Sequence, residues 1–324
     1  MSGISTTRAL LRVGTRGSAL ASAQAEGFAR ALRATTGIPV ELVMVTTHGD
    51  LSPEPLAQIG GTGVFVSALR AALLDGTVDV AVHSMKDLPT GPADGLALAA
   101  VPVREDPRDV LVAGGRRHLD DLPARARIGT GSLRRGAQLR AAARAAGRDV
   151  QVVDVRGNVD TRLRRVAQGD LDAVVLARAG LARLGRLEEV TQTFDPEVMT
   201  PAPGQGALAV ETRSDGPARE AVAALDDLPT RLAVTAERAL LAALEAGCAA
   251  PVGALAVLDG PVLALRAVVS SLDGLTVLRR ARTTPIHTVA DAAAVGVDLA
   301  RDLLADDAAR LLPVPTGSVA REHP

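Results

Sequence analysis

The chain has 324 residues, of which 47% are hydrophobic and 23% charged, and its formal net charge is −1. This length and composition predict a globular protein of two or three domains with substantial cores. The balanced charge and the absence of Trp and Tyr argue against a nucleic-acid-binding protein, which needs a basic face and aromatic stacking platforms. No apolar stretch is long enough for a signal peptide or a membrane span, so we expect a cytoplasmic protein without membrane partners.

Alternating apolar strands and amphipathic helices predict an α/β unit at the start of the chain. Thr15–Ser18 forms the first strand-to-helix turn, where free backbone N–H groups offer an anion site. The Gly- and Pro-rich segment Thr47–Gly63 is expected to be a functional loop. The expected strands are 11–14, Val40–Thr46 and Val78–Val82, and the expected helices are Ala19–Thr35 and Val64–Leu74.

A short polar stretch follows the last of these strands. It contains Lys86, the only lysine of the chain, directly before Asp87. Because every other cationic side chain apart from histidine is an arginine, a lysine here indicates a need for a compact ammonium group. Open α/β sheets bind their ligands at the C-terminal ends of strands, so we predict a site at these two residues. The alternative is a solvated Lys-Asp pair without function.

A second set of elements repeats the first. Residues 12–18 resemble 127–132, and residues 76–82 resemble 169–175, in the same order along the chain. We therefore expect two lobes of similar α/β build that face one another across a cleft. Chance similarity in a chain rich in Ala, Gly and Val is the alternative.

The chain then returns to the first lobe and adds a third unit. A turn-rich segment leads into a strand at Ala207–Glu211, which is expected to rejoin the first lobe. Thr230 is expected to cap a helix at Arg231–Ala246 that stops at Gly247. A small α/β domain with an antiparallel sheet follows, with strands at Val252–Leu258, Val262–Ser270 and Leu275–Arg282 and a helix at Val289–Leu304.

Positive charge is concentrated in the second lobe. From Arg127 to Arg183 the sequence has twelve arginines and only five acidic residues. Several of these arginines fall at turns, where a guanidinium fork can bind a carboxylate or a phosphate with two hydrogen bonds. This pattern predicts a small ligand with many negative charges and favours it over nucleic acid.

The single cysteine, Cys248, lies in a Gly-Cys-Ala-Ala-Pro loop. It has no partner for a disulfide within the chain, which suits a reducing compartment. A lone cysteine is commonly a small buried hydrophobe, but a loop position favours a chemical role. No metal site and no Ser-His-Asp triad are expected, because the ligand spacings and the G-x-S-x-G motif are absent.

Taken together, these motifs resemble the porphobilinogen deaminase family, also called hydroxymethylbilane synthases. The resemblance covers nearly the whole chain, and several of its motifs are specific to that family. The motifs are Gly14–Ser18, Gly60-Gly61 with Phe65, Ala81–Asp87, Arg104–Asp109, Gly129–Arg135, Arg156–Asn158, Thr161-Arg162, Ala179–Gly185, Pro203–Gly206 and Gly247–Pro251.

The resemblance implies a three-domain α/β fold. Two lobes would be built like periplasmic solute-binding proteins, one from residues 1–103 with 204–222 and the other, rich in arginine, from residues 104–203. A C-terminal domain, residues 226–324, would carry a dipyrromethane cofactor in thioether linkage to Cys248. The implied enzyme is a monomeric transferase that joins four porphobilinogen molecules head to tail on this primer. Ammonia leaves at each step, and hydrolysis releases hydroxymethylbilane, a precursor of haem and related tetrapyrroles.

The resemblance also implies the roles of individual residues. Asp87 is the expected catalytic carboxylate, which would accept hydrogen bonds from pyrrole N–H groups and stabilise positive charge as it develops. Phe65 is expected to pack on a pyrrole ring. The residues implied in holding the cofactor and the substrate through their acetate and propionate groups are Arg16, Ser18, Ser84, Lys86, Thr130, Ser132, Arg134, Arg135, Arg156, Arg162 and Arg183.

The chain departs from the family pattern at a few positions. His48, Gln58 and Thr62 stand where many relatives carry Arg or Lys, so a role for loop cations is not carried over to this chain. Asp160 replaces a small residue and is expected to reduce the local positive field. The competing functional class is a non-catalytic two-lobed protein that binds or senses a polycarboxylate, which the repeat and the arginines alone would also satisfy.

Overall fold

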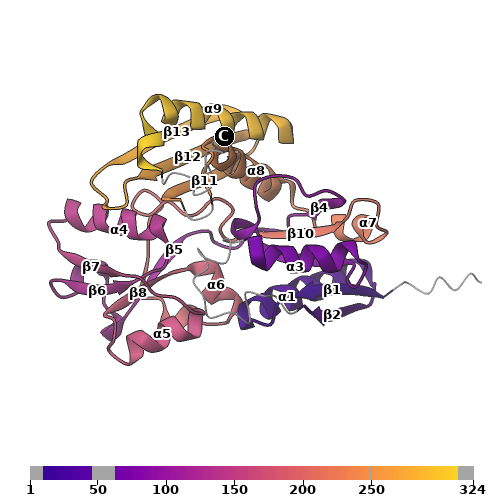
Figure 1. The fold of residues 1–324 in the computed structure, drawn as a ribbon, viewed down its shortest axis with the longest axis horizontal. Helices are drawn as coiled ribbons and strands as arrows, with labels where there is room; N and C mark the ends of the chain where they lie inside the picture. The colour runs from indigo at the N-terminus through magenta and orange to yellow at the C-terminus, as the bar shows by residue number, and fades with distance from the viewer. Residues whose placement is uncertain (1–9, 46–62, 248–249, 313–324) are drawn as a thin grey trace, which may run out of the picture.

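The computed structural model describes residues 10–45, 63–247 and 250–312, and it has three α/β domains (Figure 1). Two lobes lie side by side, and a smaller domain near the C-terminus sits above both. Each domain is built around one sheet, and the strands of each sheet fall within one of the predicted segments. The boundaries 1–103 with 204–222, 104–203 and 226–324 stay predictions.

The first lobe contains a five-stranded sheet in the order β2-β1-β3-β10-β4. β1 is parallel to β2 and β3, whereas β10 is antiparallel to β3 and β4. Apolar side chains of these strands pack against the inner face of α1, which ends at Gly37 in a left-handed conformation. The strands are β1 (Leu11–Thr15), β2 (Val40–Met44), β3 (Val80–Ser84), β4 (Leu96–Ala100) and β10 (Leu208–Arg213), and the helices are α1 (Ala19–Thr36), α3 (Gly63–Leu74) and α7 (Ala218–Ala223).

The second lobe repeats this topology with the strand order β7-β6-β8-β5-β9. β6 is parallel to β7 and β8, and β5 is antiparallel to β8 and β9. The strands are β5 (Asp109–Ala113), β6 (Ala126–Gly129), β7 (Val150–Val153), β8 (Ala173–Ala177) and β9 (Gln192–Thr193), and the helices are α4 (Leu133–Ala145), α5 (Val159–Ala167) and α6 (Arg178–Arg183).

The internal repeat is confirmed at the level of single hydrogen bonds. In the first lobe the backbone N–H of Arg12 donates to the Asp79 carboxylate at 3.0 Å, and the N–H of Asp79 donates to the Arg12 carbonyl at 2.8 Å. Arg127 and Asp172 make the same two bonds in the second lobe, at 2.8 and 3.0 Å. The matched sequence segments therefore start equivalent neighbouring strands, and the predicted strand at Ala207–Glu211 does return to the first lobe as β10.

The C-terminal domain packs α8 and α9 on one face of an antiparallel sheet in the order β11-β12-β13. At Gly296 of α9 an added Cβ would lie 2.2 Å from the Ala236 carbonyl oxygen of α8, so glycine permits this close helix packing. The elements are α8 (Leu228–Ala243), β11 (Val252–Asp259), β12 (Val262–Ser270), β13 (Val277–Pro285) and α9 (Val289–Ala305).

The predicted limits of α8 were wrong at both ends. Asp227, not Thr230, is the N-cap: its carboxylate accepts a hydrogen bond from the Thr230 N–H at 2.9 Å, and Pro229 fits the first turn. The helix ends at Ala243, because Glu245 already adopts a left-handed conformation (φ 51°) before Gly247. Within the described residues, no helix is long and apolar enough to cross a membrane.

Candidate functional site

A short turn at the end of β3 presents Lys86 and Asp87. Strand β3 is buried almost throughout, and the single 3₁₀ turn Met85–Asp87 follows it directly. Met85 is buried and its N–H donates to the Ala207 carbonyl at 3.0 Å. Gly204 lies against it with φ +74°, where an added Cβ would come within 2.7 Å of the Met85 side chain. The segment 201–206, which we call the return segment, thus packs directly against Met85–Asp87, which we call the acid turn.

The ammonium group of Lys86 lies among groups from both lobes. Its Nζ is 3.5 Å from Oε1 of Gln205. Burial and the nearby guanidinium of Arg135 lower the pKa of Lys86 to about 8, although Asp87 and Asp109 act in the opposite direction. The positive charge at this point is therefore only partly compensated by the chain, and a bound anion would stabilise it.

Two arginines of α4 converge on one buried acid of β5, Asp109. Nη1 of Arg134 is 2.7 Å from Oδ2 of Asp109 and also 2.7 Å from the Thr200 carbonyl oxygen. Nε and Nη2 of Arg135 lie 2.9 and 2.8 Å from Oδ1 of Asp109. Burial alone would raise the pKa of Asp109, but the two guanidinium groups bring it down to about 2.

The assignment of Arg134 and Arg135 to ligand carboxylates stays a prediction, and Asp109 is a competing partner inside the chain. Arg134 is 3% exposed and Arg135 6% exposed. Burial lowers the pKa of Arg134 against the opposing effect of Asp109. Both arginines lower the pKa of Lys86, and Arg135 also lowers the pKa of Arg162.

The remaining predicted arginines occupy different positions around this centre. Nε of Arg162 donates to the Gly157 carbonyl at 3.0 Å, and burial, followed by Arg135, lowers its pKa. Nη2 of Arg183 donates to the Gly206 carbonyl at 2.5 Å, and burial lowers its pKa as well. Arg156 is exposed and lies 3.4 Å from Asp154. Arg16 is half-buried in the turn between β1 and α1.

The predicted hydroxyl residues mainly support local structure. The hydroxyl of Ser18 accepts from the Ala21 N–H at the start of α1, and that of Ser132 accepts from the Arg135 N–H at the start of α4. The Thr130 hydroxyl accepts from the Ser132 N–H at 3.2 Å. The Ser84 hydroxyl accepts from the Gln24 side chain at 2.9 Å. Their contacts with a ligand stay predictions.

Some predicted positions cannot be placed. Cys248, His48, Gln58 and Thr62 lie outside the described residues, as does the side chain of Phe65. The Asp160 carboxylate pairs with Arg186, and its expected effect on the local positive field stays a prediction.

Three residues of this region were missed as site components. Asp109 and Gln205 are both buried and connect the acid turn to α4. The Gln205 side chain accepts from Lys86 and donates to Oδ1 of Asp109 at 2.9 Å, and Asp109 in turn accepts from Arg135 of α4. Glu237 of α8 is completely buried and accepts from Arg104 at 2.7 Å and from the Gly204 N–H at 2.6 Å. An acid in front of an apolar strand, or inside an amphipathic helix, was the signal that could have identified Asp109 and Glu237.

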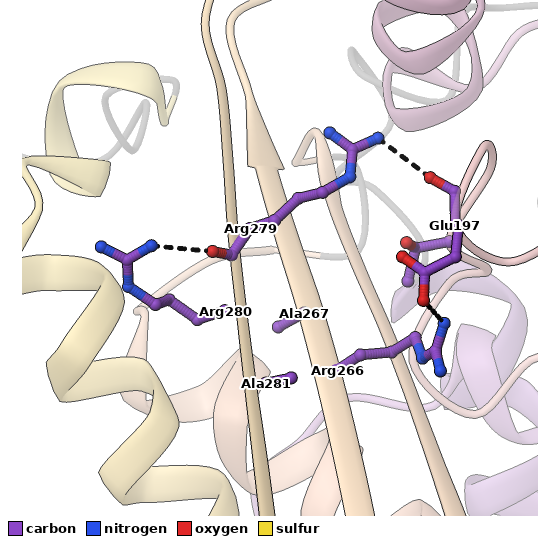
Figure 2. A pocket seen from close by; sticks show the side chains of 7 residues that line it. Glu197, Arg266, Ala267, Arg279, Arg280 and Ala281 are labelled. Atoms are coloured by element: carbon purple, nitrogen blue, oxygen red, sulfur yellow. Dashed lines mark hydrogen bonds and ion pairs between the residues drawn. The ribbon is translucent and has the colours of Figure 1, made fainter.

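A pocket lined by arginines lies between the second lobe and the C-terminal sheet, with a volume of about 210 Å³ (Figure 2). Arg266 pairs with the Glu197 carboxylate, and Arg279 donates to the Glu197 carbonyl at 3.2 Å. Arg280 points to the other side of β13 and pairs with Asp306. Residues of both domains line this pocket, and its arginines are paired with groups of the chain itself. None of its lining residues belongs to the acid turn, so the two features are separate.

The structure therefore brings Lys86 and Asp87 of the first lobe together with Arg135 and Asp109 of the second, with Gln205 of the return segment between them. A carboxylate flanked by cations suits a ligand that carries several carboxylates and a group that becomes positively charged. Among the described residues, no group of three or more His, Cys, Asp and Glu side chains is placed to hold a metal ion.

Comparison with known proteins gives consistent matches over this chain. The family described as "Porphobilinogen deaminase, dipyromethane cofactor binding domain" matches residues 11–221, and "Porphobilinogen deaminase, C-terminal domain" matches residues 231–305. The chain is 57% identical to porphobilinogen deaminase 1 of Streptomyces coelicolor, covering 94% of this chain and 98% of the relative. It is 53% identical to porphobilinogen deaminase of Leifsonia xyli subsp. xyli, covering 94% of each.

Among solved structures, the chain is similar to the methionine-binding protein MetQ, with a TM-score of 0.42 and 12% sequence identity. The match covers 66% of this chain and 88% of that protein.

Proposed function

The chain belongs to the porphobilinogen deaminase family, and on that premise we propose how its residues carry out the reaction. The activity is that of a hydroxymethylbilane synthase of tetrapyrrole biosynthesis, a transferase that uses a dipyrromethane cofactor. Four porphobilinogen molecules are joined head to tail with loss of ammonia, and water releases the linear product. A non-catalytic polycarboxylate binder is not favoured.

The cationic surroundings of the acid turn fit the cofactor. Acetate and propionate groups on each pyrrole ring would add negative charge beside Lys86 and Arg135. The single observation that carries the proposal is that these two cations, from different lobes, meet at the same side-chain oxygen of Gln205 next to Asp87. When bound, the cofactor supplies the terminal pyrrole carbon to which the first substrate ring is joined. We assign its covalent attachment to Cys248.

The chain's own residues bind and orient the rings. Lys86, Arg135, Arg162 and Arg183 would hold carboxylates. Arg135 would do so with Nη1, which does not contact Asp109 and donates within the chain to the Val175 carbonyl at 3.3 Å. Arg16, Ser18, Ser84, Thr130, Ser132, Arg134 and Arg156 complete the proposed set, with Phe65 against a ring.

Asp87 is the proposed catalytic residue. Loss of ammonia from the aminomethyl group of porphobilinogen leaves an electron-poor methylene carbon outside the ring, and the positive charge is shared with the ring N–H group. A fixed carboxylate that accepts a hydrogen bond from this N–H stabilises that charge where it develops. The same carboxylate would take part in the proton transfer that restores each new pyrrole ring.

Two further proposals concern the state of the protein. We propose a cytoplasmic location, because the single cysteine must stay reduced until the thioether forms. We also propose a monomer.

Intact mass and turnover test the assignment together. The protein from cells that make porphobilinogen should be heavier than its sequence by two linked pyrroles, and Cys248→Ser should remove this increment. Asp87→Asn should keep the increment and lose turnover about 100- to 1000-fold. Asp94→Asn, at an exposed acid of the same lobe, is the matched control and should keep full turnover. An unmodified folded protein, or an active Asp87→Asn variant, would contradict the proposal.

A further inference from the structure

One arginine of the C-terminal domain reaches across to the backbone around Asp87. Arg238 lies on α8, and its Nη1 donates to the Leu88 carbonyl at 2.9 Å and to the Met85 carbonyl at 3.4 Å. Its Nη2 donates to the Pro89 carbonyl at 2.7 Å. These three carbonyls bracket Asp87 on both sides in the sequence.

The acid turn needs such support. Met85–Asp87 is one 3₁₀ turn, closed by the 3.2 Å bond from the Leu88 N–H to the Met85 carbonyl. A turn of this length cannot satisfy the carbonyls at its C-terminal end with helical hydrogen bonds, and Pro89 has no N–H with which to hold the following segment. A cation is favourable at the C-terminal end of a helical turn, so a guanidinium is well suited to fix these carbonyls.

The residue before Arg238 holds the other side of the same turn. Glu237 accepts from the Gly204 N–H at 2.6 Å, and Gly204 lies against the side chain of Met85. Two adjacent residues of α8 thus hold both parts of this region: Arg238 binds the carbonyls around the acid turn, and Glu237 binds the return segment packed against it. Helix α8 also leads in the sequence toward Cys248.

We propose that Arg238 is a positioning residue for the reaction, which holds the Asp87 carboxylate in place through the carbonyls of Met85, Leu88 and Pro89. This inference rests on the catalytic role proposed for Asp87. It gives the C-terminal domain a second task besides carrying the cofactor, because the domain also fixes the acid that acts on the growing chain.

The test compares Arg238→Met with a matched arginine on the same helix. Arg231 lies two helical turns earlier and also donates to backbone carbonyls of the first lobe, those of Leu98 and Ala99 at 3.3 Å, but these belong to β4 and not to the acid turn. Both variants lose a contact between domains. Arg238→Met should lower kcat about 10- to 100-fold with KM changed less than about twofold, whereas Arg231→Met should keep kcat.

Two further measurements separate positioning from general stability. Arg238→Lys should recover part of kcat, because an ammonium group can still donate to the Leu88 and Pro89 carbonyls, and it carries the test if Arg238→Met does not fold. In an Asp87→Asn background, Arg238→Met should cause little additional loss, since both changes act on the same carboxylate.

Three results would overturn the inference. They are unchanged kcat in Arg238→Met, equal losses of kcat in the variants at 231 and 238, and a full additional loss from Arg238→Met when Asp87 is already asparagine. These results differ from failure of the proposed function itself, which would appear as an active Asp87→Asn variant. Intact mass confirms that each variant carries the cofactor before its kinetics are compared.

Discussion

Lys86 should make the cofactor-free protein more stable as the pH rises through the alkaline range. Its pKa is lowered from 10.5 to about 8 in the folded chain, by burial and then by Arg135. Between these two pH values the unfolded chain binds a proton that the folded chain does not, so the free energy of unfolding rises with pH. The full gain is reached near pH 10.5 and is lost as the pH falls to about 8. Its upper limit is about 3 kcal/mol, from 1.36 kcal/mol per pKa unit.

The composition makes this effect measurable. The sequence has no Tyr, one Cys and one Lys, so few groups titrate between pH 8 and 11. In the Cys248→Ser variant, which cannot attach the cofactor, Lys86 and the α-amino group are the remaining groups that titrate in this window. Urea unfolding of this variant should show the rise in stability, and the double variant with Lys86→Met should show a nearly flat curve.

A direct titration provides the second measurement. Reductive methylation with ¹³C-formaldehyde labels Lys86 and the N-terminus, and the Lys86 signal should titrate with a midpoint about 8 in the cofactor-free protein. In the cofactor-bearing protein the midpoint should move to higher pH, because added carboxylates favour the ammonium form. A midpoint near the ordinary lysine value in the cofactor-free protein, or equal pH dependence with and without Lys86, would refute the reasoning.

The buried ion pairs give further predictions. Glu237→Ala and Arg104→Ala should each lower the free energy of unfolding by about 3 to 5 kcal/mol, because each leaves a buried charge without its partner. Urea unfolding of the double variant should show less than the sum of the two losses. Asp109→Asn should cost about 3 to 5 kcal/mol at pH 7. The parent, but not this variant, should lose about 2.5 kcal/mol of stability as the pH falls from 3.8 to about 2, from 1.36 kcal/mol per pKa unit. Gly204→Ala should cost about 1 to 3 kcal/mol, because its φ is +74° and Met85 is too close. A melting temperature of Gly204→Ala equal to that of the parent would contradict this last prediction.

The sequence alone was sufficient for the two-lobe repeat and for most elements of the first lobe and the C-terminal domain, although it did not predict β4. Strand β8 is apolar throughout and β3 begins with three apolar residues, while the paired segments at 12–18 and 127–132 mark equivalent turns after β1 and β6. Such local patterns determine secondary structure because burial of one face repeats with the period of the element. The acid turn was predictable for the same reason, since Lys86 and Asp87 follow a buried strand directly.

Only the tertiary structure decided which charges meet. From the sequence, Arg134 and Arg135 were indistinguishable from the other arginines at turns, and Asp109 was one acid among many. The two arginines lie about 25 residues from Asp109 in the chain. They are buried together with it because β5, which carries Asp109, pairs with β8 in the sheet next to α4. The same holds for Arg238, whose contacts span about 150 residues. Charge interactions depend on distance and burial in three dimensions, and neither quantity is a property of a local sequence pattern.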